Sequence, residues 1–351
     1  MKEFYKNKKV LITGHTGFKG AWLGQLLCEL GASVTGVALR PHTKPNLFTA
    51  IKLKDRVKTY FADICDYQKL DRIFKKEKPE IVFHLAAQAI VRTGYNEPLL
   101  THKTNVLGTA NVLEAIRNNS SVKAAVIVTT DKVYAERLGA AYAETDPLGA
   151  NDPYSASKAA ADIVTQSYMK AFFGESGAAK IAIARAGNVI GGGDWGEDRI
   201  LTDIVRARYE NNNLLLIRNP DAVRPWQYVL EPLWGYAKLA EKLINGAGDF
   251  SRPWNFGPEE SSAKTIDVVT AAAARLGNLR YRIHPDASKP ESQILKLDPA
   301  RAIKELNWKP IYGLDEALRL TFDWYEQFYV SPRTALAITN KQISDFIHKI
   351  I

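Results

Sequence analysis

The chain has 351 residues, a formal net charge of +9 and 46% apolar residues, so it can bury a sizeable core as one large domain or two smaller ones. It has no disorder or low-complexity bias, and no apolar run approaches the roughly 20 residues of a membrane span. The N-terminus lacks the apolar core of a signal peptide. Cys28 and Cys65 are not spaced as metal ligands, so we expect a cytoplasmic protein with two structural thiols.

The positive charge raises the question of a nucleic-acid partner. Basic residues are interleaved with acidic ones, as in "LDRIFKKEKPE" (70–80), and the chain contains no helix-turn-helix, zinc-finger or base-stacking motif. A small anionic substrate needs only a few of these arginines. We therefore expect a small-molecule partner, and neither a nucleic acid nor a membrane.

Residues 1–190 alternate short apolar segments with longer amphipathic ones. This alternation predicts a Rossmann-type, doubly wound α/β fold, in which helices cover both faces of a parallel sheet. The strands are almost continuously apolar, as expected when both faces are buried. In chain order we expect a strand at 8–14, a helix at 21–31, strands at 33–39 and 57–63, a helix at 67–78, a strand at 80–87, a helix at 104–119, and strands at 122–130 and 180–191.

The pattern changes after residue 190. Glycines cluster in "GGGDWGED" (191–198), and helices are predicted at 201–212, 231–245 and 265–277 without long strands between them. We expect three parts: residues 1–190 as a dinucleotide-binding domain, residues 191–330 mainly as a smaller, mixed α/β substrate-binding portion, and residues 331–351 as a C-terminal helical extension.

The first strand and first helix are joined by "GHTGFKG" (14–20), in which Gly14, Gly17 and Gly20 are spaced G-x-x-G-x-x-G. Glycine allows a tight turn and lets a pyrophosphate approach the main chain without a Cβ in the way. The unpaired N–H groups at the start of the following helix then face the phosphates. This strand–loop–helix context predicts a dinucleotide site.

The end of the second strand bears on the choice of cofactor. An acidic residue there usually holds the ribose of NAD, but this strand ends in "ALRPH" (38–42), which offers Arg40 and no acid. Arg40 can face the extra phosphate of NADP or stack on the adenine ring. Alternatively, it is an exposed cation in a solvated loop. Asp63 and Ile64, after the third strand, are candidates for reading the adenine edge.

Two clusters of reactive side chains follow the fifth strand. Thr130, Asp131 and Lys132 place a hydroxyl, a carboxylate and an amine side by side, and Tyr154 and Lys158 form a Tyr-x-x-x-Lys pair at a helix start. Four residues apart, this pair shares one helix face. We expect the ammonium and an oxidised nicotinamide to lower the phenol pKa from about 10. Tyr154 can then move a hydroxyl proton while a hydride moves to or from the cofactor.

With the upstream glycine loop, these motifs resemble the extended short-chain dehydrogenase/reductase family. Within that family the chain resembles the nucleotide-sugar 4,6-dehydratases, above all the CDP-glucose 4,6-dehydratases. The similarity spans nearly the whole chain and is most specific in 185–199 and 224–226. It is carried by "ITGHTGFKGAWL" (12–23), "PEIVFHLAAQAIVR" (79–92), "TNVLGT" (104–109), "TTDKVY" (129–134), "DPYSASK" (152–158), "RAGNVIGGGDWGEDR" (185–199), "RNPDAVRPWQYVLEPLWGY" (218–236) and "WNFGP" (254–258).

The resemblance implies a three-step reaction on a nucleotide-diphosphate sugar. C4 is oxidised to a ketone, water is lost across C5 and C6, and the stored hydride returns to C6. Two acid–base sites are needed. The resemblance assigns Tyr154 and Thr130 to O4, and Asp131 and Lys132 to the elimination. Lys132 is then either the C5 base or an electrostatic stabiliser of the enolate.

The resemblance also implies a tightly bound NAD and a homodimer, with Arg40 leaving NADP open and no metal expected. For Arg199 the alternative is a solvated ion pair with Asp198, and Trp226 and Trp254 are expected in the core. The implied cofactor contacts are Gly14, Thr16, Gly17, Phe18, Gly20, Arg40, Asp63, Ile64, Leu85, Ala86, Ala87, Asn105, Tyr154 and Lys158, and the implied substrate contacts are Asn188, Arg199 and Arg224.

Three departures from the CDP-glucose branch concern substrate choice. The segment 135–152 is short and lacks that branch's tryptophan-containing insert, Val133 replaces a cysteine, and Arg40 is unusual near the adenosine ribose. A loop after the catalytic strand is where sugar selection is expected. A dehydratase, C4 epimerase or dehydrogenase for another nucleotide sugar therefore stays open, as does a non-catalytic binding protein.

Overall fold

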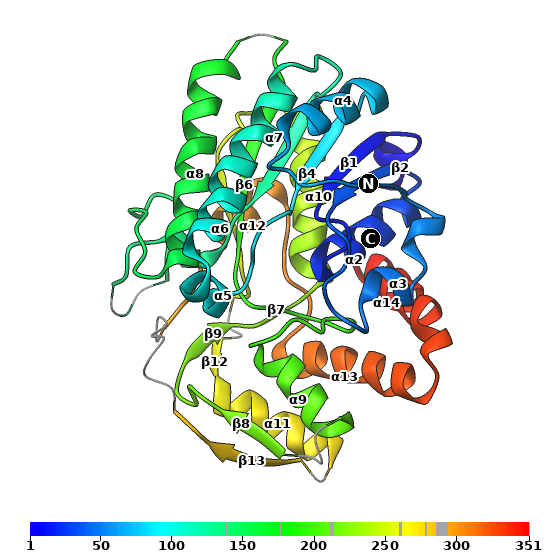
Figure 1. The fold of residues 1–351 in the computed structure, drawn as a ribbon, viewed down its shortest axis with the longest axis vertical. Coiled ribbons are helices and arrows are strands. Elements are labelled where there is room, and N and C mark those ends of the chain that lie inside the picture. Colours follow the sequence, from blue (N-terminus) through cyan, green and yellow to red (C-terminus); the bar gives the residue numbers. More distant parts are fainter. Residues whose placement is uncertain are drawn as a thin grey trace.

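A computed structural model describes residues 1–137, 139, 141–175, 177–210, 214–259, 262–277, 279–285 and 294–350. Its centre is a sheet of seven strands in the order β11-β6-β5-β4-β1-β2-β3 (Figure 1). All neighbouring strands run parallel. The strands are Lys9–Thr13 (β1), Ser33–Ala38 (β2), Lys58–Phe61 (β3), Ile81–His84 (β4), Ala124–Val128 (β5), Lys180–Ala186 (β6) and Pro253–Phe256 (β11).

Helices cover both faces of this sheet. Side chains alternate along a strand, so in β1 Val10 and Ile12 join one apolar cluster and Leu11 joins another. The Rossmann-type, doubly wound sheet is therefore confirmed. The first cluster includes side chains of α2 (Phe18–Glu29) and α10 (Leu230–Asn245), and the second those of α4 (Tyr67–Glu77), α7 (Gly108–Arg117) and α8 (Pro153–Phe172).

Local signals account for the ends of these helices. Gly31 follows α2 with φ +88°, a left-handed conformation that favours glycine. Asp152 caps α8 by accepting a hydrogen bond from the Ser155 N–H at 2.9 Å. The shorter helical segments are Lys2–Tyr5 (α1), Leu47–Ala50 (α3), Leu53–Asp55 (η1), Val91–Asn96 (α5), Pro98–His102 (α6), Lys103–Leu107 (η2, a π-helix) and Asp131–Val133 (η3).

The chain returns to the large sheet after residue 190. Helix α10 packs against β5 and β6, and β11 pairs with β6 so that Trp254 lies beside Ala184. β11 thus extends the large sheet formed by residues 1–190, and α10 covers one face of it. That residues 1–190 bind the dinucleotide and residues 191–330 mainly the substrate, with residues 331–351 as an extension, stays a prediction.

The strand predicted at 180–191 is wrong in its second half. β6 ends at Ala186, and Val189–Ile190 (β7) pairs with Gln227–Tyr228 (β10) outside the large sheet. Gly187 marks the break, because a Cβ there would meet the ring of Pro225. The strand therefore leaves the sheet where the chain must pass close to another backbone.

The smaller portion contains two-stranded sheets and helices. Residues 211 and 212, at the end of the helix predicted over 201–212, lie outside the described residues. β8 pairs with β13 in parallel and β9 with β12 antiparallel. The elements are Ile200–Tyr209 (α9), Leu214–Ile217 (β8), Val223–Pro225 (β9), Ser262–Lys264 (β12), Thr265–Leu276 (α11), Arg280–Ile283 (β13), Ala300–Leu306 (α12) and Leu314–Val330 (α13).

The C-terminal segment consists of Pro332–Thr334 (η4) and the helix Ala335–Ile350 (α14); residue 351 lies outside the described residues. α14 runs beside α2 and α13 (Figure 1). The Gln25 side-chain amide donates to Asn340 Oδ1 at 2.6 Å, and the Trp324 indole donates to Thr339 Oγ1 at 2.9 Å. The last helix thus braces the helix that follows the glycine loop.

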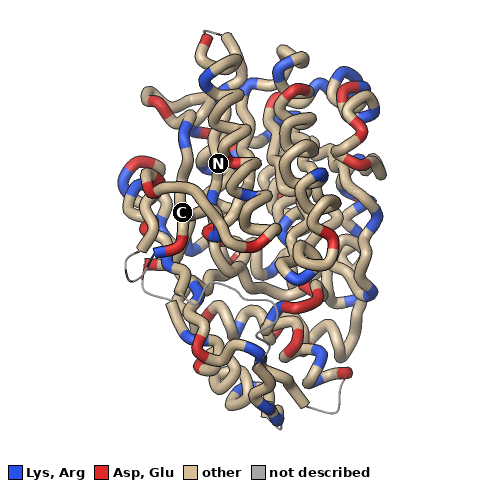
Figure 2. The backbone as a smooth tube through the Cα atoms, turned by 60° about the vertical axis from the view of Figure 1, so that its left-hand side comes forward, with Lys and Arg blue, Asp and Glu red and all other residues tan. Residues whose placement is uncertain are grey.

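In Figure 2 the Lys and Arg positions and the Asp and Glu positions are interspersed among the other residues. No helix in the described ranges is both long enough and apolar enough to cross a lipid bilayer.

The contact between Gly192 and Trp324 predicts a loss of stability. The Trp22 indole donates to the Gly192 carbonyl at 2.9 Å, and a Cβ on Gly192 would overlap the fully buried Trp324. We expect Gly192→Ala to reduce the free energy of unfolding by about 1–3 kcal/mol, measured by urea unfolding. Gly174→Ala, whose nearest neighbouring atom would lie 3.9 Å from the new Cβ, is the control. An equal loss in both variants would contradict the overlap as the cause.

Candidate active site

The candidate site lies at the carboxyl ends of β1, β4 and β5. The strand order reverses between β1 and β4, because β2 lies on one side of β1 and β4 on the other. In open parallel sheets, ligands bind in the crevice beyond such a point. Gly14, Leu85 and Thr130 follow these three strands closely, so the topology gathers the predicted cofactor and catalytic segments at one edge.

The glycine loop has the shape that a pyrophosphate needs. Gly14 has φ +79°, and a Cβ there would lie 2.7 Å from the Ala86 nitrogen. A Cβ on Gly20 would overlap the Gly14 carbonyl, so the helix starts directly against the turn. Gly17 is exposed and its Cβ position is open apart from the Gly14 oxygen at 3.5 Å. The start of α2 is thus accessible to an anion.

Two further loop residues hold this turn in place. The Thr16 hydroxyl donates to the Leu39 carbonyl at 2.9 Å, which ties the loop to the end of β2. Phe18 is half-buried and packs beside Gly191, whose Cβ would lie 3.3 Å from the Phe18 ring. The loop is therefore anchored on both sides.

The side chains beyond β2 and β3 surround the predicted adenosine position. Arg40 is exposed, and its guanidinium lies 4.4 Å from the centre of the Phe61 ring, a cation–π contact. Asp63 is exposed and accepts the Cys65 N–H at 2.8 Å. Ile64 is buried at 3% exposure. Of the three, Arg40 and Asp63 present charged groups to the surface.

His15 also lies here, and the sequence reasoning missed it. Its ring is fully buried against Gly36, where any Cβ would overlap it, and Nε2 lies 3.1 Å from Thr59 Oγ1. Burial lowers the pKa of His15 to about 4. A glycine in the middle of β2 was the available signal, because it marks a close approach of another group.

Asn105 fastens the segment after β4. Its Oδ1 accepts the Gln88 N–H at 2.8 Å, and its Nδ2 donates to the Gln88 carbonyl at 3.0 Å and to Ser157 Oγ at 2.8 Å. Asn105 belongs to the π-helical η2, a geometry that is frequent at functional sites. Leu85, Ala86 and Ala87 just before Gln88 stay partly exposed, so this segment is accessible at the carboxyl end of β4.

A buried histidine joins the ends of two strands to helix α7. His84 Nδ1 lies 2.7 Å from Thr13 Oγ1, and Nε2 lies 2.9 Å from Thr109 Oγ1. The Thr109 hydroxyl donates its proton to the Asn105 carbonyl at 2.6 Å, so it must accept from Nε2–H. Nδ1 then accepts from Thr13. Burial and, to a lesser extent, the charge of Lys158 lower the pKa of His84 to about 3, consistent with a neutral ring.

Thr130, Asp131 and Lys132 lie at the carboxyl end of β5, as predicted. The Thr130 hydroxyl donates to Asp131 Oδ1 at 2.9 Å. Burial raises the pKa of Asp131, and the charge of Lys132 opposes that rise. Asp131 Oδ2 is buried and accepts no hydrogen bond from the residues that the structure describes. Asp131 can therefore carry a proton and has one free oxygen from which to exchange it.

Tyr154 and Lys158 lie on α8, facing this segment, and both are buried. Burial raises the pKa of Tyr154 to about 12, while a hydrogen bond with Thr130 lowers it. Lys158 donates to the Val128 carbonyl at 2.8 Å. Burial lowers the pKa of Lys158 to about 7, and Lys19 contributes to that fall. In the chain alone desolvation dominates the pKa of Tyr154, so the lowering expected from Lys158 together with an oxidised nicotinamide stays a prediction.

Lys19 is a site residue that the sequence reasoning missed. It lies in the first turn of α2, and burial lowers its pKa to about 8, with Arg199 also lowering it and Asp131 raising it. A cation at a helix N-terminus opposes the helix dipole. A lysine between the second and third loop glycines was therefore the signal that could have identified it.

Of the predicted substrate residues, Asn188 and Arg199 lie in the segments after β6 and β7, and Arg224 lies in β9. Arg199 donates to Asp194 Oδ2 at 2.5 Å and lowers the pKa of Tyr154. The alternative pairing with Asp198 is wrong, because Asp198 contacts Arg92 at 3.5 Å and also Arg218.

Arg224 is 6% exposed and lowers the pKa of Asp131, which places its charge near the catalytic segment. Asn188 is half-buried, and its carbonyl accepts the Gln227 N–H at 3.0 Å. Trp226 and Trp254 are buried, at 3% and 0% exposure, as core packing requires. In the described part of the chain, no group of His, Cys, Asp or Glu side chains is arranged to hold a metal.

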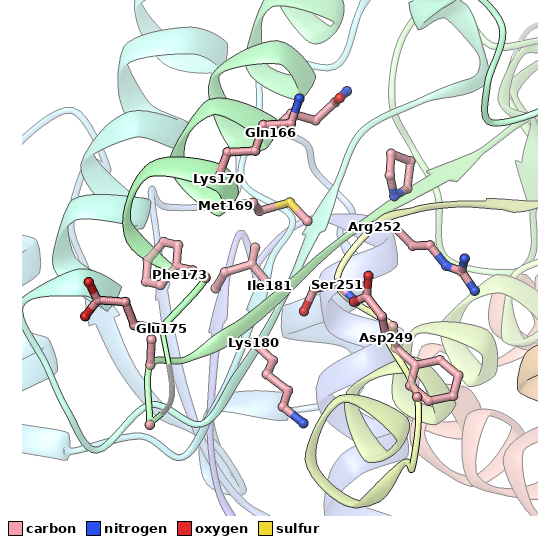
Figure 3. A pocket seen from close by; sticks show the side chains of 16 residues that line it. Gln166, Met169, Lys170, Phe173, Glu175, Lys180, Ile181, Asp249, Ser251 and Arg252 are labelled. Carbon is pink, nitrogen blue, oxygen red and sulfur yellow. The ribbon is translucent and has the colours of Figure 1, made fainter.

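A cavity of about 750 Å³ lies elsewhere, between the end of α8, the start of β6 and residues 248–253 (Figure 3). Lys170, Glu175 and Lys180 line it, with Met169 and Phe173 as its apolar part. It lies at the amino end of β6, whereas sites in parallel sheets form at carboxyl ends. The chemistry therefore stays with the crevice beyond β5.

Comparison with known proteins shows the family to which this chain belongs. The sequence pattern of the GDP-mannose 4,6 dehydratase family matches residues 11–321. The chain belongs to this family. It is 41% identical over 353 residues to CDP-glucose 4,6-dehydratase of Salmonella typhimurium, covering 99% of this chain and 98% of that protein. It is 28% identical to dTDP-glucose 4,6-dehydratase of Shigella flexneri, covering 90% and 92% of the two chains. The resemblance to the nucleotide-sugar 4,6-dehydratases is confirmed.

Solved structures share the fold. A dTDP-glucose 4,6-dehydratase from Streptomyces venezuelae, solved with NAD bound, superposes with a TM-score of 0.77 at 22% identity and covers 91% of this chain and 97% of its own. An epimerase from Methanothermobacter thermautotrophicus gives 0.80 at 21% identity, covering 95% and 96%.

The buried histidines predict a loss of stability in acid. Burial lowers the pKa of His84 to about 3 and that of His15 to about 4, so below about pH 6.5 the unfolded chain binds protons that the folded chain does not. The free energy of unfolding should fall toward pH 4, by up to ~1.4 kcal/mol per pH unit for each histidine.

His84→Gln should remove one histidine's part of that slope in urea unfolding series at several pH values. His102→Gln, at an exposed position, should leave the slope unchanged. An unchanged slope in His84→Gln would mean that His84 takes up its proton in the folded state.

Proposed function

We propose that this protein is a CDP-glucose 4,6-dehydratase that converts CDP-glucose to CDP-4-keto-6-deoxyglucose with NAD. The 41% identity along 99% of the chain to a curated CDP-glucose 4,6-dehydratase supports the substrate. One observation carries the reaction type: Asp131 and Lys132 lie next to Thr130, which hydrogen-bonds Tyr154. The site thus holds a second acid–base pair beside the one that oxidation needs.

The glycine loop fits NAD, because Gly14 and Gly20 allow a tight turn that a Cβ would block, and Gly17 leaves the start of α2 open to a pyrophosphate. The contacts would come from the glycine loop, from the ends of β2 to β4, and from Tyr154 and Lys158. Bound NAD supplies a hydride acceptor for C4 and a hydride donor for C6. Arg40 is occupied with Phe61, which supports NAD over NADP.

In the first step Tyr154 removes the proton of O4, and Thr130 orients the tyrosine. The ammonium of Lys158 and the guanidinium of Arg199 favour the ionised phenol. Further positive charge is needed, since the pKa of Tyr154 stays raised to about 12 by burial although Thr130 and Arg199 lower it. Because C4 stays a ketone in the product, Tyr154 does not return this proton to O4 and must release it to water before the next turnover.

In the elimination the protonated Asp131 donates its proton from Oδ2 to the leaving O6 hydroxyl. Desolvation, which raises the pKa of Asp131, keeps that proton available. Lys132 withdraws the C5 proton or stabilises the negative charge that develops on the C4 oxygen. The C4 ketone makes this step possible by acidifying C5–H.

The nucleotide diphosphate would lie against Asn188, Arg199 and Arg224, since guanidinium groups suit bidentate contacts with phosphate. Residues 191–330 would thus bind mainly the nucleotide sugar. The segment 135–152, of which residues 138 and 140 lie outside the described residues, follows Lys132 and is the candidate for sugar selection.

We also infer a homodimer in the cytoplasm. Large apolar side chains are exposed on α6, η2 and α8: Leu99 at 85%, Leu107 at 52%, Ile163 at 55% and Phe172 at 47%. Such patches commonly mark protein–protein contacts, and these helices belong to the dinucleotide domain. Free Cys28 and Cys65 suit a reducing compartment.

The deciding experiment is mass spectrometry of the purified protein incubated separately with CDP-, dTDP-, GDP- and UDP-glucose. We expect CDP-glucose to lose one molecule of water without net consumption of NAD. A product of unchanged mass but new chromatographic position would instead indicate the C4 epimerase. Net reduction of NAD would indicate a dehydrogenase, and binding of the nucleotide sugar without turnover a non-catalytic protein.

Lys132→Met tests the second acid–base pair. We expect binding of CDP-glucose to persist while formation of the 4-keto-6-deoxy product falls by at least roughly 100-fold. Tyr154→Phe should stop the reaction earlier, so that transient reduction of NAD in a single-turnover assay is lost in Tyr154→Phe but retained in Lys132→Met. Near wild-type product formation by Lys132→Met would remove Lys132 from the elimination.

A further inference from the structure

Asp162 is a buried carboxylate that the reaction itself does not use. It lies on α8 one helical turn after Lys158 and has no exposed surface. Its Oδ2 accepts from Arg185 Nε at 2.8 Å and from Thr129 Oγ1 at 3.2 Å. Its Oδ1 accepts from Arg185 Nη2 at 2.9 Å and from Gln166 Nε2 at 2.8 Å. Four hydrogen bonds from three residues thus surround this carboxylate.

Arg185 is the counter-ion of this carboxylate and is itself 1% exposed. Its remaining nitrogen donates to Tyr134 Oη at 3.0 Å and to the Glu144 carbonyl at 3.2 Å. The guanidinium also lies over the Tyr134 ring, 5.0 Å from its centre. Arg185 thus connects β6, through Asp162 and Tyr134, to helix α8 and to both ends of the catalytic segment.

A buried ion pair of this kind is weak evidence for stability, because desolvation offsets most of its attraction. Its position is more informative. Asp162 holds Thr129, the residue just before Thr130, by a hydrogen bond. Asp162 also shares helix α8 with Tyr154 and Lys158. Asp162 therefore connects the end of β5, which carries Thr130 to Lys132, to helix α8, which carries Tyr154 and Lys158. This connection fixes the distance between the two acid–base clusters.

The charges around Lys158 give Asp162 a second effect. Lys19 approaches from α2 and lowers the pKa of Lys158, whereas Asp162 on its own helix raises it. His84 faces Lys158 from β4 and is held neutral by burial. Asp162 therefore opposes the cationic and desolvating influences that would leave Lys158 uncharged.

We propose that Asp162, with Arg185 as its counter-ion, is a positioning residue that locks Thr129 to α8 and keeps Lys158 charged beside Tyr154. This inference rests on the proposed function for its catalytic consequence. A charged Lys158 stabilises the tyrosinate that removes the O4 proton, so loss of Asp162 should slow oxidation at C4 and leave sugar binding intact.

The first test is an NMR titration of protein with isotope-labelled lysine, without substrate. The Lys158 signal is assigned by its loss in Lys158→Arg. In Asp162→Asn we expect the Lys158 titration midpoint to move to lower pH. In the control Gln166→Ala, which removes one neutral donor to the same carboxylate, we expect the wild-type midpoint. An unchanged midpoint in Asp162→Asn would overturn the proposal.

Asp162→Asn leaves the cation of Arg185 buried without its partner, which can prevent folding. Asp162→Asn/Arg185→Gln avoids this by making both partners neutral. We expect this double variant to fold and to keep the lowered midpoint, because Asp162 lies four residues after Lys158 on the same helix and its charge acts on Lys158. A wild-type midpoint in the folded double variant would also overturn the proposal.

The second test is kinetic. For Asp162→Asn or the double variant we expect kcat with CDP-glucose to fall roughly 10- to 100-fold, with little change in KM and with the alkaline limb of the pH profile moved to lower pH. A higher KM with unchanged kcat and pH profile would contradict a positioning role. If the wild type does not convert CDP-glucose, the proposed function fails, while the titration still decides the role of Asp162.

Discussion

Desolvation of charged groups at the carboxyl end of β5 is the condition on which this site depends. Asp131 and Lys158 are 2% and 5% exposed, and burial raises the pKa of the first and lowers that of the second. In water these groups would hold fixed charges at neutral pH. Buried here, Asp131 can carry the proton that an elimination demands, whereas Lys158 depends on neighbouring charges to stay positively charged. Burial also raises the pKa of Tyr154, so Tyr154 needs nearby cations in order to lose its proton.

The fold creates this environment by bringing distant segments to one edge. The sheet covers one side of the site. On another side, the glycine loop and the start of α2 bring Lys19 close enough for its charge to interact with Asp131. Arg199 and Arg224, from the part after residue 190, carry charges that act on Tyr154 and Asp131 respectively. The return of β11 to the sheet and the brace of α14 on α2 keep these parts together. Of these cations Arg224 is buried, whereas Lys19 and Arg199 stay partly exposed to water.

Local patterns account for what the sequence predicted well. The apolar strands, the spacing of Gly14 and Gly20 and the pairing of Tyr154 with Lys158 involve neighbours in sequence, and each has a period or spacing that one element imposes. The break of the strand at Gly187 was missed, because it depends on Pro225 from another segment. Lys19 and His84 were missed for the same reason: their partners lie 25 or more residues away in the chain.

By itself the sequence determined the parallel sheet, the glycine turn and the types of side chain at the end of β5, since these follow from local periodicity and from residue chemistry. The tertiary structure alone decided the charge states. The pKa of Lys158 near 7 and the four hydrogen bonds of Asp162 come from burial and from partners on other elements. Desolvation and electrostatic interactions depend on distances in space, which no spacing along the chain specifies.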